Sequence, residues 1–217
     1  PEGLRDWMYS LGFDVFFGLN SKASTFFKNG KYQIKDNSTG LSSRELISYY
    51  EELNKNTHLL YIEDPLDQDD WEGWTALFEK LSGTTIIAGG DLIATNPYRL
   101  QIAIDKKAVN AIVIKPGQYY LVQTIESVNT PLDLMPIVHT RTSLFRAGLL
   151  LLNSKTDPGY QGQLTMGLTN LSPFPVRLQM GARICNIIFH KIKGKTVSYR
   201  GQHQGGRVSP HKEERQV

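Results

Sequence analysis

Two groups of residues in this sequence could carry out chemistry, and they lie in different halves of the chain. In the first half, polar or glycine residues directly follow short apolar runs: Asn20, Glu63 with Asp64, Gly90 with Asp91, and Lys115. Carboxylates that converge from neighbouring strand ends can bind Mg²⁺, which prefers hard oxygen ligands. A lysine beside them could remove a proton from carbon. These residues therefore form a candidate metal and acid–base site.

In the second half, the segment HTRTSLFR combines hydroxyl and guanidinium groups, which are suited to phosphate oxygens. The residues concerned are Arg141, Thr142, Ser143 and Arg146. Arginines also form ordinary ion pairs at interfaces, so this segment alone leaves both interpretations open.

The segment TDPGYQG places Asp157 before a Pro-Gly turn and follows it with Tyr160 and Gly162. An acid on a tight turn beside an aromatic ring could activate water next to a sugar that stacks on the ring. A plain hairpin turn would explain the same residues.

The C-terminal tail is rich in glycine and charge. Gln202, Gln204 and Arg207 could fold over a bound triphosphate like a lid. A tail of this composition is expected to be mobile when no ligand is bound, and simple disorder is the alternative interpretation.

The elements that must position the first group follow an α/β repeat. Apolar runs that suit parallel strands lie at 14–20, 58–64, 84–91 and 110–115. Helical segments lie between them, and in one of these Ser42 and Glu45 form a plausible capping box. The last three strands recur about every 26 residues, which is typical of βα units. In a (β/α) barrel, chemistry occurs at the C-terminal ends of strands.

From Pro116 onward the pattern changes to short β-rich segments: GQYYLVQTIESV, PIVHTRTSLF, GQLTMGLTN, FPVRLQMG and ARICNIIFHKI. Their spacing of about 10 residues favours a sandwich or jelly roll. We therefore expect two domains, an α/β domain at 1–115 and a β domain with a mobile tail at 116–217.

The net charge of +3 is divided unevenly between these halves. Residues 1–115 carry 12 Lys+Arg and 16 Asp+Glu, a net charge of −4, whereas residues 116–217 carry 12 and 5, a net charge of +7. The basic half suits an anionic ligand such as a nucleoside triphosphate, or nucleic acid, although a solvated basic surface is equally compatible.

The cellular compartment is indicated by cysteine content and hydropathy. A single cysteine, Cys185, excludes an intrachain disulfide and favours a reducing compartment. No apolar run reaches the roughly 20 residues that span a bilayer, and the first 30 residues lack a signal-peptide pattern. We expect a soluble, cytoplasmic protein without a membrane partner.

Residues 1–115 resemble a central fragment of enolase in four successive blocks: VFFGLNSKASTFFKNGKYQIKD, YIEDPLDQDDWEGW, AGGDLIATNPYRL and KKAVNAIVIKP. The resemblance implies part of a (β/α) barrel in which Glu63 matches a ligand of catalytic Mg²⁺ and Lys115 matches the general base. Asn20 and Gly90 stand where the family has aspartates, although Asp91 is retained. Losing two of three charges should nearly abolish the metal site.

The family's N-terminal domain and later barrel strands have no counterpart in the sequence. We therefore expect no functional metal site in this half, and no enolase turnover.

Residues 116–217 resemble the trimeric dUTPase and dCTP deaminase superfamily in three ordered motifs: PGQYYLVQTIESVNTPLDLMPIVHTRTSLFRAGL, TDPGYQGQLTMGLTNLSPFPVRLQMGARICNIIF and YRGQHQGGRVS. The resemblance implies a β jelly roll and a homotrimer with active sites between subunits. By motif match, Ser143 and the nearby arginines would bind phosphates. Asp157 would lie at the deoxyribose and orient or activate water, and Tyr160 would pack against the sugar. Gln204 and Arg207 would close over the nucleotide.

One position distinguishes the two branches of this superfamily. Its deaminases carry a catalytic glutamate in the strand after the DPG turn, where this sequence has Gly167. Glycine cannot transfer a proton, so the diphosphatase branch is favoured. The superfamily's earlier aspartate motif, associated with the Mg²⁺–triphosphate, has no counterpart in residues 1–115.

The sequence therefore predicts a chimera of fold class α/β plus all-β, an enolase-like partial (β/α) barrel followed by a dUTPase-like β jelly roll. The favoured activity is hydrolysis of dUTP to dUMP and pyrophosphate by a homotrimer, with Mg²⁺ carried on the triphosphate. The alternative is a catalytically silent scaffold or trimerising nucleotide-binding module, and enolase is a distant third. Specific nucleic-acid binding is not expected.

Overall fold

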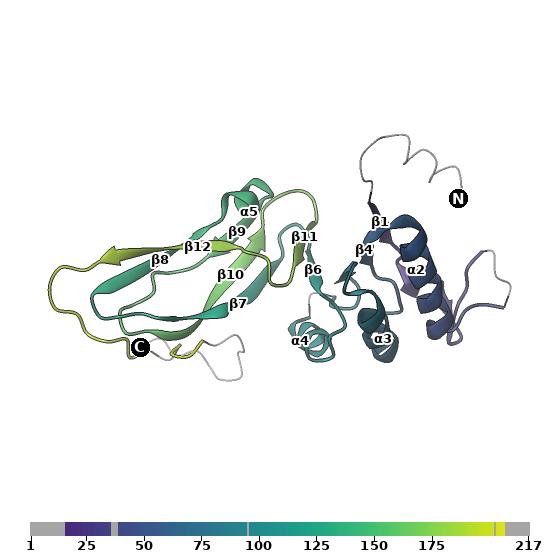
Figure 1. Ribbon diagram of the computed structural model, residues 1–217, viewed down its shortest axis with the longest axis horizontal. Helices are drawn as coiled ribbons and strands as arrows, with labels where there is room; N and C mark the ends of the chain where they lie inside the picture. Colours follow the sequence, from purple (N-terminus) through teal and green to yellow (C-terminus); the bar gives the residue numbers. More distant parts are fainter. Residues whose placement is uncertain (1–15, 36–38, 95, 202, 207–217) are drawn as a thin grey trace. The chain divides into compact units, whose positions relative to one another are not determined.

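The computed structural model describes residues 16–35, 39–94, 96–201 and 203–206 (Figure 1). The chain divides into two compact units. The first unit consists of Pro1–Val113 with Arg177–Met180, and the second of Ile114–Val176 with Gly181–Val217. Each unit is described by itself.

The first unit is built on a five-stranded sheet of order β1-β4-β5-β6-β11. Its strands are β1 (Phe17–Asn20), β4 (Leu59–Glu63), β5 (Ile86–Gly89), β6 (Ala111–Ile114) and β11 (Val176–Gln179). The pairs β1/β4, β4/β5 and β5/β6 are parallel, as the sequence predicts. A small hairpin of β2 (Phe27–Lys28) and β3 (Lys31–Tyr32) follows the 3-10 helix η1 (Ala23–Phe26).

Three helices connect these strands: α2 (Ser43–Thr57), α3 (Trp71–Leu81) and α4 (Pro97–Asp105). The capping box that the sequence predicts at the start of α2 is confirmed, because the Ser42 side chain accepts from the Glu45 amide and the Glu45 side chain accepts from the Ser42 amide. At the start of α4, the Asn96 side chain accepts from the amides of Tyr98 and Arg99. Local sequence therefore fixes where both helices begin.

The two faces of this sheet differ. The larger core joins strand residues such as Ile62 and Ile87 to helix residues such as Trp74 and Leu77. On the alternate positions of the same strands, a smaller cluster contains Ala88, Ala111 and Val113, with Tyr61 and Ile86 packed against it. Because side chains alternate along a strand, the helices cover the face of the large core, and Tyr61 and Glu63 point to the other face.

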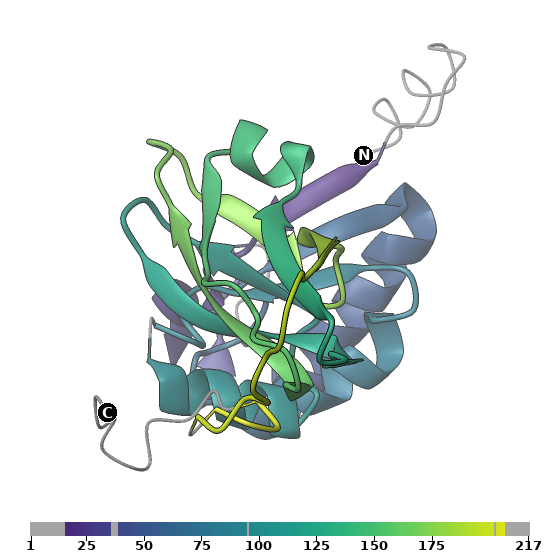
Figure 2. The same cartoon turned by 90° about the vertical axis from the view of Figure 1, so that its left-hand side faces the viewer.

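The second unit contains a three-stranded sheet of order β7-β10-β9 and a two-stranded sheet of β12 and β8. These strands are labelled in Figure 1, and Figure 2 shows them in teal to yellow. The strands are β7 (Tyr119–Asn129), β8 (Leu134–Thr140), β9 (Leu149–Leu152), β10 (Gln161–Asn170) and β12 (Cys185–Lys191). All three strand pairs are antiparallel. A one-turn helix, α5 (Thr142–Arg146), connects β8 and β9.

Hydrogen bonds join the two sheets of this unit. Thr140 Oγ1 accepts from the Leu151 amide at 3.3 Å, and Asn153 Nδ2 donates to the Val138 carbonyl at 3.0 Å. The chain as a whole is thus a mixed α/β structure with several sheets. Among the described residues, no helix is long and apolar enough to cross a membrane.

One segment lies apart from its expected neighbours. The sequence places FPVRLQMG with the β-rich segments of the second half, yet β11 from this segment is the neighbour of β6. The Met180 amide donates to the Asn110 carbonyl at 2.8 Å at the end of this pair. The first unit is therefore assembled from two separate stretches of chain.

Candidate functional sites

Glu63, the retained enolase-like carboxylate, ends strand β4 and is only 8% exposed. Its Oε2 accepts from Arg177 Nε at 3.1 Å and Arg177 Nη2 at 3.0 Å, and it also accepts from the Tyr61 hydroxyl. The Arg177 guanidinium lies 4.8 Å from the centroid of the Tyr61 ring. The carboxylate is therefore already neutralised by a cation from β11.

Asp64, next to it, holds the loop after β5. Its Oδ1 accepts from the amides of Gly90 and Asp91 at 2.8 and 3.0 Å. Burial and the nearby charges of Asp91 and Glu63 raise the pKa of Asp64 to about 6, against the lowering effect of the two amide hydrogen bonds. This carboxylate holds the backbone of the loop at Gly90 and Asp91 and is not arranged to bind a metal.

The other enolase-like positions do not complete a cation site. Asn20 is exposed at the end of β1, opposite Glu63 in the strand register. Lys115 is exposed and belongs to the second unit, where its amide donates to Gln118 Oε1 at 2.8 Å. No group of three or more His, Cys, Asp or Glu suited to a metal occurs among the described residues. The residues present do not fit the Mg²⁺ that the enolase family implies.

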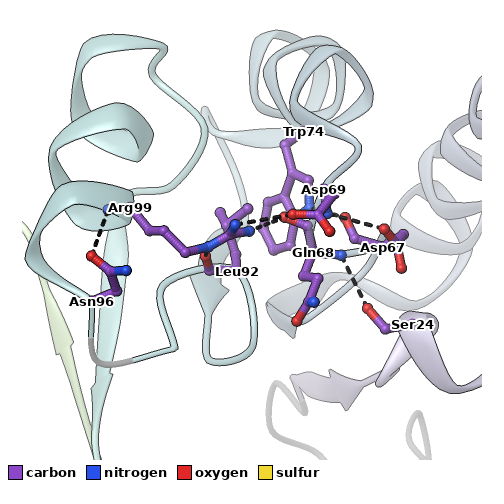
Figure 3. A network of polar contacts seen from close by, with 8 residues as sticks. All are labelled: Ser24, Asp67, Gln68, Asp69, Trp74, Leu92, Asn96 and Arg99. Carbon is purple, nitrogen blue, oxygen red and sulfur yellow. Dashed lines mark hydrogen bonds and ion pairs between the residues drawn. The ribbon is translucent and has the colours of Figure 1, made fainter.

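The loops beyond the strand ends are tied to one another, mainly through Arg99 of α4 (Figure 3). Its Nε donates to the Leu92 carbonyl at 2.5 Å, its Nη1 pairs with Asp69 Oδ1 at 3.0 Å, and its Nη2 donates to the Gln68 carbonyl. The Gln68 amide in turn donates to Ser24 Oγ at 3.0 Å. Trp74 Nε1 donates to the Asp67 carbonyl at 3.0 Å. These polar groups thus hold the loops in place.

The second unit contains a cavity of about 400 Å³. Its lining combines the DPG turn, strand β10 and the C-terminal segment: Leu121, Val138, Asn153, Ser154, Lys155, Thr156, Asp157, Tyr160, Leu164, Thr165, Met166, Tyr199, His203 and Gly206. A volume of this size is within the range of small-molecule sites. The cavity brings together Asp157 and Tyr160, two of the residues that the sequence proposes for a nucleotide.

Asp157 and Tyr160 have defined partners at this cavity. Asp157 Oδ1 forms an ion pair with Lys155 Nζ, two residues earlier. The Tyr160 hydroxyl donates to the Gln163 carbonyl at 2.5 Å, and its ring meets the Tyr199 ring edge-on with centroids 5.5 Å apart. Burial, followed by the neighbouring Tyr199, raises the pKa of the Tyr160 hydroxyl.

The C-terminal segment docks along the DPG turn of the same chain. The Gly205 amide donates to the Gln161 carbonyl at 2.8 Å, and Gln204 Nε2 donates to the Gly159 carbonyl at 3.4 Å. Gly162, with φ of 137°, makes an isolated bridge with Gly205, whose backbone would lie 2.4 Å from a Cβ at 162. Glycine is therefore required for the segment to approach. Gln202 and Arg207, the other tail residues of the proposed site, lie outside the described residues.

The phosphate-binding candidates lie elsewhere in the second unit. Thr142, Ser143 and Arg146 are exposed on α5, and Arg141, which precedes it, donates from Nη1 to the Arg183 carbonyl at 3.1 Å. None of these four residues lines the cavity. One chain therefore does not bring the arginine cluster and the DPG turn into a single site.

Gly167 is buried on β10, between Leu121 of β7 and Leu152 of β9. A Cβ at this position would lie 2.5 Å from the Tyr119 hydroxyl oxygen. A longer side chain at 167 would therefore require the exposed Tyr119 side chain to move. No carboxylate stands at the position that the deaminases use.

Several residues of these sites were not identified from the sequence. Lys155 could have been noticed, because a lysine two residues before an acid is a short-range pattern. Thr165 has no sequence pattern of this kind. It is of interest only because its buried hydroxyl lacks a hydrogen-bond partner among the described groups, which the structure alone reveals. Arg177 pairs with a residue 114 positions away, so no local pattern could reveal it.

The architecture is that of an α/β unit with parallel strand pairs, joined in sequence to an antiparallel β unit with a cavity. Residues 4–134 match the family model of the enolase C-terminal TIM barrel domain, which covers 131 of the 217 residues. The chain therefore belongs to this family. A second family model, described as dCTP deaminase-like, matches residues 95–192. Together the two matches confirm the chimera that the sequence predicts, and they overlap across its junction.

Proposed function

We propose that the second unit hydrolyses dUTP to dUMP and pyrophosphate. Water would attack the α-phosphorus, the anhydride bond to the β-phosphate would break, and pyrophosphate would leave as its Mg²⁺ complex. The observation that supports this proposal most is the cavity of about 400 Å³ with Asp157 and Tyr160 in its wall. The dCTP deaminase-like match independently supports a nucleotide-metabolising site.

In this proposal each residue has a separate role. Asp157 orients or activates water beside the deoxyribose, whose ring packs against Tyr160. Gln204, Arg207 and Gln202 close over the nucleotide, while Gly162 allows their approach. The triphosphate is bound by Arg141, Thr142, Ser143 and Arg146, and Mg²⁺ arrives on the nucleotide itself.

The proposed assembly is a homotrimer of jelly-roll units. Since the phosphate-binding cluster does not line the cavity of its own chain, we propose that it serves the cavity of a neighbouring subunit. Exposed apolar side chains support such an interface, because Ile187, Ile188 and Phe189 on β12 are 36%, 48% and 50% exposed.

Diphosphatase activity is favoured over deamination by the buried Gly167 beneath Tyr119. Cleavage of the anhydride needs only an oriented water, Mg²⁺ and phosphate contacts, whereas deamination needs a proton donor and acceptor at the base. The Lys155–Asp157 ion pair favours the alternative function, a silent nucleotide-binding scaffold, because it engages the carboxylate that must act on water.

The test compares pyrophosphate release from dUTP with ammonia release from dCTP, for the unmodified protein and for Asp157→Asn. We expect pyrophosphate only, and a loss of roughly 100-fold or more in Asp157→Asn, as is typical for removal of a general base. Asp133→Asn is the control, because Asp133 is exposed and does not line the cavity.

Ammonia without pyrophosphate would refute the diphosphatase assignment. Binding of dUTP without either product would identify the silent scaffold. We expect no dehydration of 2-phosphoglycerate in the same preparations, because Asn20 and Gly90 supply no charge and Glu63 is paired with Arg177.

A further inference from the structure

Strand β11 connects the two sequence families in an unexpected way. Arg177 lies within the dCTP deaminase-like match, yet it belongs to the first compact unit, in which β11 is the neighbour of β6. The strand therefore brings a positive charge from one family's segment to the sheet of the other.

That charge is directed at one carboxylate. Arg177 donates twice to Glu63 Oε2, at 3.1 and 3.0 Å, from two different nitrogens. Its guanidinium group also lies over the Tyr61 ring at 4.8 Å, and the Tyr61 hydroxyl donates to the same carboxylate oxygen.

Glu63 needs such partners because it is buried. An ionised carboxylate away from water is costly unless a cation or several donors compensate it. In enolase-like proteins a divalent cation would do so, but Asn20 and Gly90 do not help to bind one here, and Asp64 is used by the Gly90 and Asp91 amides. Of the described residues, only Arg177 forms an ion pair with Glu63.

We propose that Arg177 takes the place of the divalent cation in the enolase-like unit, and that this ion pair holds β11 at the edge of β6. The unit is then stabilised by its own guanidinium group and is independent of metal. A segment from the nucleotide-related half thereby becomes a structural part of the enolase-like half. This inference does not depend on the nucleotide activity proposed above.

The first experiment tests independence from metal. Unfolding by urea is followed through tryptophan fluorescence, which reports on the first unit because Trp71 and Trp74 lie on α3 and the sequence from residue 114 onward contains no tryptophan. The midpoint for the unmodified protein should be the same in millimolar Mg²⁺ and in EDTA. A higher midpoint in Mg²⁺ would overturn the proposal.

The second experiment tests the ion pair. Arg177→Met should lower the unfolding midpoint and raise hydrogen exchange of the Met180 amide by roughly 5- to 30-fold, since a loss of one or two kcal/mol changes an opening equilibrium by that factor. Gln179→Met is the matched control, because Gln179 is exposed on the same face of the same strand. Equal effects of the two variants would refute a specific role for Arg177.

A third measurement remains decisive if Arg177→Met is too unstable to purify. Glu63→Gln removes the negative charge that requires a cation, so Arg177→Met should be tolerated better in that background than in the unmodified protein. Where Arg177→Met can be purified, the double variant should lose less stability than the sum of the two single changes, and where it cannot, the double variant should still be purifiable. Strictly additive losses in the first case, or a double variant that is also too unstable to purify in the second, would contradict the ion pair.

Discussion

At the scale of single residues, the hydroxyl of Thr165 is a buried polar group in the cavity wall without a partner among the described residues. An unpaired buried hydroxyl costs on the order of 1–3 kcal/mol, which a polar group of a ligand could recover.

Thr165→Val should therefore stabilise the free protein and weaken nucleotide binding. We expect a rise of about 2–4 °C in the melting temperature, corresponding to about 1 kcal/mol in a chain of this size. Thr130→Val is the matched control, because Thr130 has the other unpaired hydroxyl and does not line the cavity. Calorimetric titration with dUTP should show weaker binding in the first variant only. Unchanged affinity in Thr165→Val would exclude contact with the ligand.

Asp64 gives the first unit a defined pH dependence. Burial, with the charges of Asp91 and Glu63, raises its pKa in the folded state to about 6 from an ordinary value of 3.8. Between pH 3.8 and about 6 the folded state keeps a proton that the unfolded state releases. The free energy of unfolding therefore falls as pH rises through this range, and the loss is complete above about pH 6.

Asp64→Asn should remove this dependence. Asparagine keeps an oxygen acceptor for the Gly90 and Asp91 amides and tolerates the left-handed backbone at φ 47°. We expect the variant to be more stable than the unmodified protein at pH 7 by about 1–3 kcal/mol, and the difference to vanish near pH 4. Urea unfolding at several pH values measures it, and a difference that is constant with pH would contradict the assignment.

At the scale of elements, the C-terminal segment depends on one glycine. Gly162→Ala would place a Cβ 2.4 Å from the backbone of Gly205, so the segment must leave the DPG turn. Hydrogen exchange of the Gly205 amide, which donates to the Gln161 carbonyl, should rise by roughly 5- to 30-fold.

Gly194→Ala is the matched control for this change. Gly194 also has a positive φ, 104°, but a Cβ there would meet open space. Both variants carry backbone strain, and only one carries the steric clash. Similar exchange in the two variants would show that strain alone, without contact, explains the effect.

Much of the element structure follows from local sequence, and the exceptions have a physical reason. The capping box of α2 and the parallel strands of the first unit are set by residues within a few positions of each other, so they could be predicted. The placement of β11 could not be predicted, because VRLQ has the composition of any short strand. Its neighbour β6 lies about 65 residues earlier in the chain, and Glu63, the partner of Arg177, lies 114 residues before it. The cavity was predictable only in part, since Asp157 and Tyr160 share a motif whereas Thr165 and Tyr199 come from other elements.

At the scale of the whole molecule, assembly can be measured directly. We expect light scattering to give three times the chain mass of 24.5 kDa, because the apolar side chains exposed on β12 need a covering surface. Ile188→Asp should shift the protein toward smaller species and reduce dUTP turnover together. Tyr98→Asp, on an exposed residue of α4, should change neither. A clean monomer of the unmodified protein at micromolar concentration would exclude a site shared between subunits.

The position of β11 has a consequence for dividing this gene. Because residues 177–180 return to the first unit, that unit is discontinuous in sequence, and the segment from 114 to 176 is an insertion within it. A cut at the family junction near residue 115 would give a fragment without its fifth strand and with a buried, unpaired Glu63. The chain crosses between the units three times. The first unit therefore cannot be completed until residues 177–180, which lie in the segment that matches the other family, have been added.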